Sequence, residues 1–224
     1  MSVKPTIELT ADGSHTLFIS ELDEHYHSVN GAIQESTHVF IDAGLHHCTK
    51  DEIHIFEVGF GTGLNAFLTL VDNQSTSKKI YYNTVEAYPL DTDIISKLNY
   101  PQDYSADKQE LYYKLHKAAW EQDIQITPNF CLKKIEADFT QFDWSLIRDI
   151  DLIYFDAFAP DKQSDLWTQK IFDNLYKVSN DQAILSTYCA KGMVRRMMQQ
   201  AGFVTERLPG PPGKREMLRA TKII

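Results

Sequence analysis

The chain has 224 residues, 43% of them hydrophobic, which suits one sizeable globular domain and leaves too little length for two. We find no apolar run of the roughly 18 residues that a membrane span needs and no charged and apolar leader. The three cysteines include no CxxC pair, which favours a reducing compartment and argues against a structural zinc site. We therefore expect a cytoplasmic protein with no membrane association and no obligatory protein partner.

Two short alternating runs at 6–9 and 15–20 flank Ala11-Asp12-Gly13-Ser14, a turn sequence that predicts an amino-terminal β-hairpin. Further strands are predicted at 53–58, 80–86, 130–135, 152–155, 183–187, 203–208 and 216–221. Helical patterns fall at 63–72, 91–98, 107–119, 141–148, 165–177 and 191–200. This succession predicts a hairpin extension over residues 1–50 and a main domain over residues 51–224.

The alternation of strands and helices predicts a doubly wound, mostly parallel α/β sheet. The last two strands break the pattern, because only Pro209-Gly210-Pro211-Pro212-Gly213-Lys214-Arg215 joins them and no crossover helix fits in that link. They should therefore pair antiparallel. The expected fold is a Rossmann-like, seven-stranded sheet with an antiparallel last strand, the architecture of class I methyltransferases that use S-adenosyl-L-methionine (AdoMet).

A glycine-rich turn follows the strand at 53–58, in the sequence Glu57-Val58-Gly59-Phe60-Gly61-Thr62-Gly63-Leu64-Asn65. Glycines let the backbone turn sharply and approach a ligand, and free N–H groups opening the next helix favour a polar or anionic group. A dinucleotide fingerprint wants a small residue where Leu64 stands, whereas Glu57, two places before the first glycine, is typical of an AdoMet loop. The sequence favours AdoMet over a nicotinamide dinucleotide or a ligand-free turn. The expected cofactor-binding residues are Glu57, Gly59, Gly61, Gly63 and Asn65.

Two acidic residues stand at the ends of the next strands, where ligands of such sheets bind. Glu86 follows Gly63 by 23 residues, and its carboxylate is placed to accept hydrogen bonds from both ribose hydroxyls. Asp138 is placed to accept from the adenine amino group, although Glu136 has similar chemistry. Each residue has a simpler interpretation as a solvated acid at a strand end.

The strand at 152–155 leads into Asp156-Ala157-Phe158-Ala159-Pro160, where we place the reaction. An amine must direct its lone pair at the sulfonium methyl group, so a carboxylate that accepts an N–H orients and activates it. We expect Asp156 to be catalytic and to contact the cofactor, and Phe158 to stack on a planar base. The alternative is that Asp156 only ends a buried strand and Phe158 belongs to the core.

The formal net charge of −9 counts against nucleic-acid binding, but the charge is unevenly distributed. Residues 191–224 carry +6, whereas the other 190 residues carry −15. A local basic face on an acidic body is therefore possible. An ordinary helix and hairpin with solvated charges is the alternative.

Several separated motifs occur in a characteristic order. They are Tyr26-His27-Ser28 through Val39-Phe40-Ile41, Asp156-Ala157-Phe158-Ala159-Pro160 with Leu166-Trp167, Ser186-Thr187-Tyr188, Val194-Arg195-Arg196 with Ala201-Gly202-Phe203, and Gly213-Lys214-Arg215-Glu216-Met217. In that order they resemble the methyltransferase domain of the bacterial tRNA 5-methylaminomethyl-2-thiouridine methyltransferases (MnmC type), over roughly residues 12–222. The resemblance implies AdoMet-dependent methylation of the aminomethyl nitrogen of a tRNA wobble uridine, giving 5-methylaminomethyl-(2-thio)uridine. It also implies substrate contacts by Tyr26, His27, Arg195, Arg196, Lys214 and Arg215. For Lys214 and Arg215 the alternative is a place in the lining of the active site instead of contact with phosphate.

Two-domain members of that family carry a flavin-dependent oxidase after the methyltransferase. This sequence has no second glycine-rich loop, so we expect no FAD and an aminomethyl substrate made by another enzyme. We expect no metal, because His25, His27, His46 and His47 have no cysteine or acidic partner at ligand spacing. The alternatives are an aminopropyl transferase or small-molecule N-methyltransferase on the same fold, and a non-catalytic nucleotide-binding module.

Overall fold

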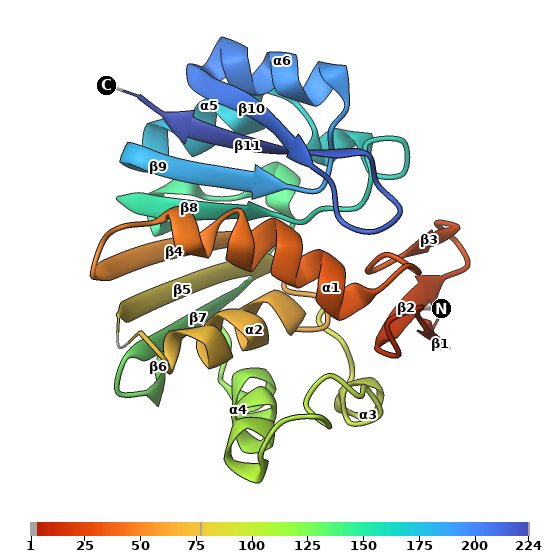
Figure 1. Ribbon diagram of the computed structural model, residues 1–224. Helices are drawn as coiled ribbons and strands as arrows, with labels where there is room; N and C mark the ends of the chain where they lie inside the picture. The colour runs from red at the N-terminus through yellow and green to blue at the C-terminus, as the bar shows by residue number, and fades with distance from the viewer. Residues whose placement is uncertain (1–3, 77, 224) are drawn as a thin grey trace.

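A computed structural model describes residues 4–76 and 78–223. The chain begins with a small antiparallel sheet of β1 (Thr6–Leu9), β2 (His15–Ile19) and β3 (Glu24–His25), in which β2 is central. The predicted hairpin at 6–9 and 15–20 corresponds to β1 and β2, and β3 adds a third, short strand. This sheet lies beside the main body of the molecule (Figure 1).

The main body is built on one eight-stranded sheet with the order β10-β11-β9-β8-β4-β5-β7-β6. Its strands are β4 (Glu52–Val58), β5 (Lys79–Glu86), β6 (Asp123–Thr127), β7 (Phe130–Glu136), β8 (Ile150–Phe155), β9 (Ser179–Thr187), β10 (Phe203–Pro209) and β11 (Glu216–Lys222). Strand β11 lies between β10 and β9 and pairs antiparallel with both, as predicted. The sheet is therefore that of a class I methyltransferase, with one added strand.

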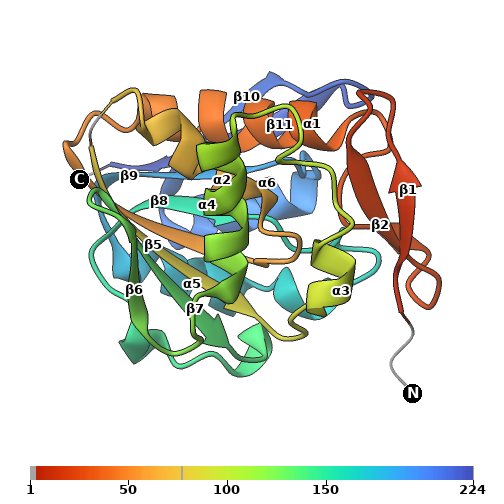
Figure 2. The same ribbon diagram turned by 90° about the horizontal axis from the view of Figure 1, so that it is seen from below.

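Helices cover both faces of this sheet. They are α1 (Ala32–Ser36) continuing into the π-helical η1 (Thr37–Asp42), η2 (Leu45–His47), α2 (Leu64–Asn73), α3 (Thr92–Ile95), α4 (Ala106–Lys117), η3 (Phe139–Gln141), η4 (Trp144–Leu146), η5 (Ser164–Leu166), α5 (Gln169–Val178) and α6 (Gly192–Ala201). Figure 2 shows α1 and α2 above the strands and α5 beneath them. No helix in the described ranges is long and apolar enough to cross a membrane.

Side-chain alternation along the strands produces two hydrophobic cores. Ile55 and Leu152 face the core shared with η1, α2 and α4, whereas their neighbours Phe56 and Ile153 face the core shared with α5 and α6. Because both faces are covered, β8 is buried along its whole length.

Three elements differ from the predictions. The helical stretch of α1 and η1 was not predicted and lies within residues 1–50, for which only a hairpin extension was expected. Strand β6 was not predicted. It is a short run of alternating polar and apolar residues at the edge of the sheet, where it pairs with β7 through a tight turn at Pro128-Asn129. The helix predicted at 141–148 is instead a pair of single 3-10 turns. Asp138 and Asp143 accept hydrogen bonds from the backbone N–H of Thr140 and Ser145, which favours isolated turns over a continuing helix.

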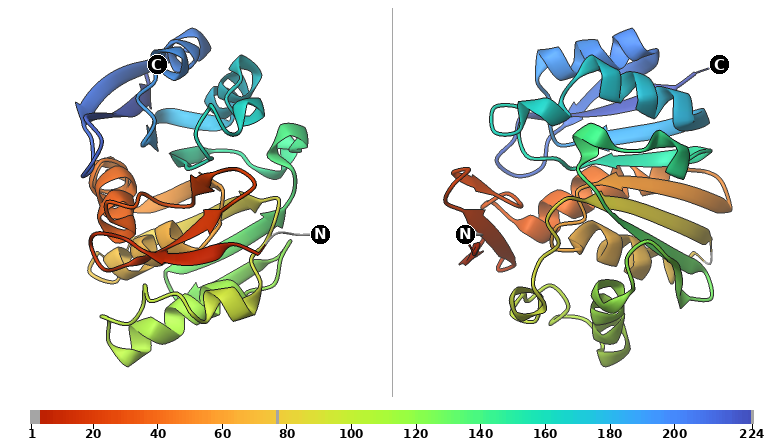
Figure 3. Two further views of the ribbon diagram at one scale, coloured as in Figure 1. Left: turned by 90° about the vertical axis from the view of Figure 1, so that its right-hand side faces the viewer. Right: turned by 180° about the vertical axis from the view of Figure 1, so that it is seen from behind.

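The carboxyl ends of the parallel strands meet at one edge of the sheet, and this edge positions the site. The small amino-terminal sheet lies across it (Figure 3). The segment after β9 and the β10–β11 loop reach the same edge, since β10 runs parallel to β9. Residues from distant parts of the sequence therefore come together there.

Candidate active site

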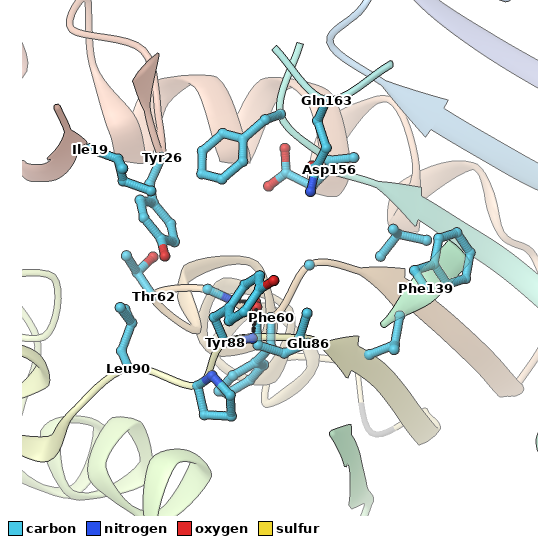
Figure 4. Close-up of a pocket in the computed structure, with 18 of the residues that line it drawn as sticks. Ile19, Tyr26, Phe60, Thr62, Glu86, Tyr88, Leu90, Phe139, Asp156 and Gln163 are labelled. Carbon is cyan, nitrogen blue, oxygen red and sulfur yellow. Dashed lines mark hydrogen bonds between the residues drawn. The ribbon is translucent and has the colours of Figure 1, made fainter. Parts of the chain in front are cut away.

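A cavity of about 730 Å³ opens at the carboxyl ends of β4, β5, β7 and β8. Its walls come from the turns after these strands and from Ile19 and Tyr26 of the amino-terminal segment. Figure 4 shows Asp156 and Glu86 on opposite sides of the open space. Its volume lies in the range that holds a nucleotide-sized ligand.

The glycine-rich turn forms one wall in a conformation that requires glycine. Gly59 and Gly61 have φ angles of +91° and +47°, and a Cβ on Gly61 would lie 3.0 Å from the Tyr26 ring. The Gly61 N–H donates to Glu86 Oε2 at 2.9 Å, and the Tyr88 N–H donates to Glu86 Oε1 at 2.9 Å. The strand-end carboxylate is thus held in place by backbone donors, with lone pairs remaining for a ligand.

Thr62, at the centre of this turn, is held by three side chains. Its hydroxyl contacts His27 Nε2 at 2.8 Å, and its carbonyl accepts from Tyr112 at 2.9 Å and from His116 at 3.1 Å. Burial lowers the pKa of His27 to about 4 and that of His116 to about 3. Both imidazoles are therefore neutral at pH 7 and hold the turn through hydrogen bonds rather than charge.

Asp156 stands at the end of β8 and is open to the cavity on one side. Asn65, in the first turn of α2, donates its amide N–H to Asp156 Oδ2 at 2.7 Å. Burial raises the pKa of Asp156 to about 7, an effect that the Asn65 hydrogen bond and the charge of Lys214 oppose and the charge of Glu35 reinforces. A carboxyl group with this pKa is suited to exchanging a proton near neutral pH.

Aromatic rings line the cavity near this carboxyl group. Phe158 and Tyr26 meet edge to face, with ring centroids 5.2 Å apart. Trp167 does not line the cavity and donates its indole N–H to the Phe158 carbonyl at 2.8 Å, which fixes the turn after β8.

Most of the residues predicted for cofactor binding line this one cavity. They are Gly59, Gly61, Asn65, Glu86, Asp138 and Asp156. Asp138 is on the cavity wall and its neighbour Glu136 is not, which favours Asp138 as the acid nearest a ligand.

Glu57 and Gly63 lie behind the wall rather than on it. Glu57 is fully buried, and neither carboxyl oxygen has a hydrogen-bond partner in the described part of the chain, although Thr84, Asn65 and Tyr82 are neighbours. Burial raises its pKa to about 8, so the group is largely protonated at pH 7.

The predicted substrate-binding residues divide into two groups. Tyr26 and His27 line the cavity. The basic residues lie outside it: Arg195 and Arg196 in the first two turns of α6, and Lys214 and Arg215 in the β10–β11 loop.

In the basic tail, residues 191–224, several of the charged side chains are already paired with acids. Ion pairs join Lys191 to Asp161, Arg207 to Glu216, Lys214 to Glu35, and Arg219 to Glu206. Within residues 4–76 and 78–223, Arg195, Arg196 and Arg215 form no ion pair with an acid.

Several residues near the site had no functional prediction. Thr62, Tyr88 and Gln163 line the cavity, and Glu35 and Tyr188 lie behind its wall. Thr62 was detectable as the polar residue between two loop glycines. Glu35 was not, because its ion-pair partner, Lys214, is 179 residues away.

Together, the sheet order, the glycine-rich turn and the strand-end carboxylates define a class I AdoMet-dependent methyltransferase. The cavity fits AdoMet in the chemistry of its walls, with acceptors at two strand ends and a turn that brings the backbone to the ligand.

Comparison with known proteins agrees with this class. A family described as S-adenosyl-L-methionine-dependent methyltransferase matches residues 102–223, more than half of the chain. The chain belongs to this family.

Two curated proteins are similar to the chain in sequence, and one solved structure is similar to it in fold. The chain is 30% identical over 216 residues to the tRNA 5-methylaminomethyl-2-thiouridine biosynthesis bifunctional protein MnmC of Pseudomonas putida, an alignment covering 88% of this chain and 32% of that protein. It is 28% identical over 225 residues to the protein of the same description from Cupriavidus metallidurans, and this alignment covers 93% of the chain and 32% of that protein. The chain thus spans about a third of the length of these curated relatives.

The crystal structure of MNMC2 from Aquifex aeolicus superimposes on this chain with a TM-score of 0.83 at 24% sequence identity, and the superposition covers 98% of this chain and 71% of that one. The resemblance to an MnmC-type methyltransferase domain is confirmed.

The glycine-rich turn provides a direct test of the cofactor site. Gly61→Arg should abolish AdoMet binding measured by calorimetry, because its side chain must enter the cavity or displace Tyr26. Gly13→Arg is the matched control, since Gly13 also has positive φ but a Cβ there meets nothing within 4 Å. Normal AdoMet affinity in the Gly61 variant, or tighter binding of NADH than of AdoMet by the unmodified protein, would contradict this site.

Proposed function

We propose that the protein transfers the methyl group of AdoMet to the aminomethyl nitrogen of a modified wobble uridine in tRNA. The observation that carries this proposal is the carboxyl group of Asp156, held by Asn65 at the open end of β8 and facing a cavity with an acceptor at the opposite wall. The relatives named for 5-methylaminomethyl-2-thiouridine biosynthesis supply the substrate class.

In this proposal the cofactor lies between the turns after β4 and β5. Glu86 accepts hydrogen bonds from the ribose hydroxyls and Asp138 from the adenine amino group, while the turn from Gly59 to Gly63 approaches the methionine end. Glu57 supports that turn from beneath. Bound AdoMet supplies an electrophilic methyl group on a sulfonium sulfur.

Asp156 then acts on the incoming amine. It accepts an N–H, aims the nitrogen lone pair at the methyl carbon, and takes the proton released as the new C–N bond forms and the C–S bond breaks. Phe158 and Tyr26 hold the uracil ring by packing against its face and edge. The transfer changes the redox state of neither partner, so the proposed reaction needs no redox cofactor.

The tRNA reaches the cavity across the carboxyl edge of the sheet. Arg196 and Arg215 are exposed at this edge without acidic partners in the described chain, so their guanidinium groups are available for phosphates. Arg195 is half-buried with its Nε enclosed, so it can offer only the end of its guanidinium group. We propose residues 1–50 as an extension whose sheet covers the cavity and residues 51–224 as the methyltransferase domain.

The basic edge can be tested by reversing two exposed charges. Arg196→Glu with Arg215→Glu should weaken tRNA binding and flatten its dependence on salt, because fewer counterions are released, while AdoMet affinity stays unchanged. The matched control, Lys79→Glu with Lys177→Glu, makes the same charge change at the opposite edge of the sheet. Equal tRNA affinity in the two double variants would rule out the proposed RNA surface.

Removal of the carboxyl group tests the reaction step. Asp156→Ala should slow single-turnover methyl transfer by about a hundredfold or more, with AdoMet and tRNA affinities changed by less than about tenfold. Asp181→Ala, an exposed acid near the start of β9, should leave the rate unaltered. Near-normal turnover in a folded Asp156 variant would show that the residue is structural.

The same step predicts a pH dependence. The unmodified enzyme should gain rate as pH rises through about 7, where Asp156 loses its proton, and again toward about 10 as the alkylamine loses its own. Asp156→Ala should retain only the second rise. A pH profile identical to that of the unmodified enzyme would exclude Asp156 as the proton acceptor.

A further inference from the structure

Glu35 and Lys214 form a largely buried ion pair between α1 and the β10–β11 loop. The Glu35 side chain is 8% exposed and that of Lys214 is 32% exposed. Removing charges from water costs free energy that an ion pair only partly recovers, so such a pair is weak support for stability alone. Its surroundings indicate a different role.

The pair is connected on each side to the cavity wall. Glu35 Oε2 accepts from the Ser28 N–H at 2.8 Å, and Ser28 follows His27, which lines the cavity. On the other side, Lys214 Nζ lies 3.9 Å from the centroid of the Tyr188 ring.

Tyr188 continues this connection to the reacting carboxylate. Its hydroxyl donates to the Ala157 carbonyl at 2.8 Å, and Ala157 directly follows Asp156. Four chain segments, which carry Ser28, Glu35, Tyr188 and Lys214, are therefore joined behind the wall that presents Asp156.

We propose that Glu35 and Lys214 are positioning residues for Asp156, which fix the turn that carries its carboxylate and balance the charge around it. The proposal rests on the proposed function, in which that carboxylate accepts the proton of the amine. It also assigns Lys214 a place behind the active site, and leaves phosphate contact in this loop to Arg215.

The two partners act on Asp156 with opposite signs. Lys214 favours the ionised carboxylate and lowers its pKa, whereas Glu35 disfavours the ionised form and raises it. Glu86 faces Asp156 from the opposite wall of the cavity (Figure 4). The titratable groups that are closer to Asp156 in the described part of the chain include Glu57 of β4, Tyr82 of β5 and Tyr188 after β9, all held neutral by raised pKa values. The ion pair is therefore the charged influence on Asp156 from the elements packed around it.

Carbon-13 NMR of protein labelled at the aspartate carboxyl carbon measures this effect without a methyl acceptor. The Asp156 resonance is assigned by its loss in Asp156→Asn, and its titration is followed in AdoMet-free protein. Glu35→Gln should lower the Asp156 midpoint by about one pH unit, and Lys214→Met should raise it by a similar amount.

Three further variants separate charge from structure. Lys214→Arg should keep the midpoint of the unmodified protein, and the double variant Glu35→Gln with Lys214→Met should return close to it. Arg215→Met, which removes the neighbouring exposed charge, should move the midpoint by less than about 0.3 pH unit because solvent screens it.

Shifts in the same direction for Glu35→Gln and Lys214→Met, or no shift in either, would overturn the proposal. The methyl-transfer assay adds a second readout, since the lower rise in its pH profile should follow the NMR midpoint in each variant. If the two variants shift the NMR midpoint in opposite directions but the pH profile of methyl transfer does not change, the role of Asp156 in the reaction is contradicted. The effect of Glu35 and Lys214 on the Asp156 carboxyl group would still hold.

Discussion

The site depends on a backbone turn between β4 and α2 whose glycines have no room for side chains. A Cβ at Gly59 would lie 3.1 Å from the carbonyl oxygen of Asp156, so the cofactor turn and the turn after β8 meet backbone to backbone. Asn65, at the start of α2, reinforces this contact through its hydrogen bond to the Asp156 side chain. Because the two turns are packed together, a group bound by one is placed within reach of the other.

Charge is arranged in two zones around this turn. Inside, the carboxyl groups of Asp156 and Glu86 line the cavity, which suits a sulfonium and an amine that arrives as an ammonium ion. Outside, Arg196 and Arg215, which form no ion pair within the described ranges, are exposed at the carboxyl edge and suit a polyanion. The acidic body and basic tail of the sequence thus match the two ligands of opposite charge in the proposed function.

The parts of the fold predicted from sequence are those specified by neighbouring residues. Seven strands of the main sheet, among them the antiparallel β11, and the glycine-rich turn follow from local alternation, link length and glycine spacing. The pairing of Lys214 with Glu35 and the hold of His27 on Thr62 could not be predicted, since they join segments far apart in the chain. The raised pKa of Asp156 could not be predicted either, because it depends on the packing of α1, α2 and the β10–β11 loop around the carboxyl group.

The central claim is that the acceptor of the methyl group is an aminomethyl group on tRNA. Its most direct test incubates the protein with AdoMet labelled in the methyl group and either bulk tRNA from cells lacking the enzyme or a metabolite extract of those cells. After nuclease digestion, the account predicts label in a single nucleoside, 5-methylaminomethyl-(2-thio)uridine, and none in the metabolite fraction. Label in small metabolites with unmodified tRNA would contradict it.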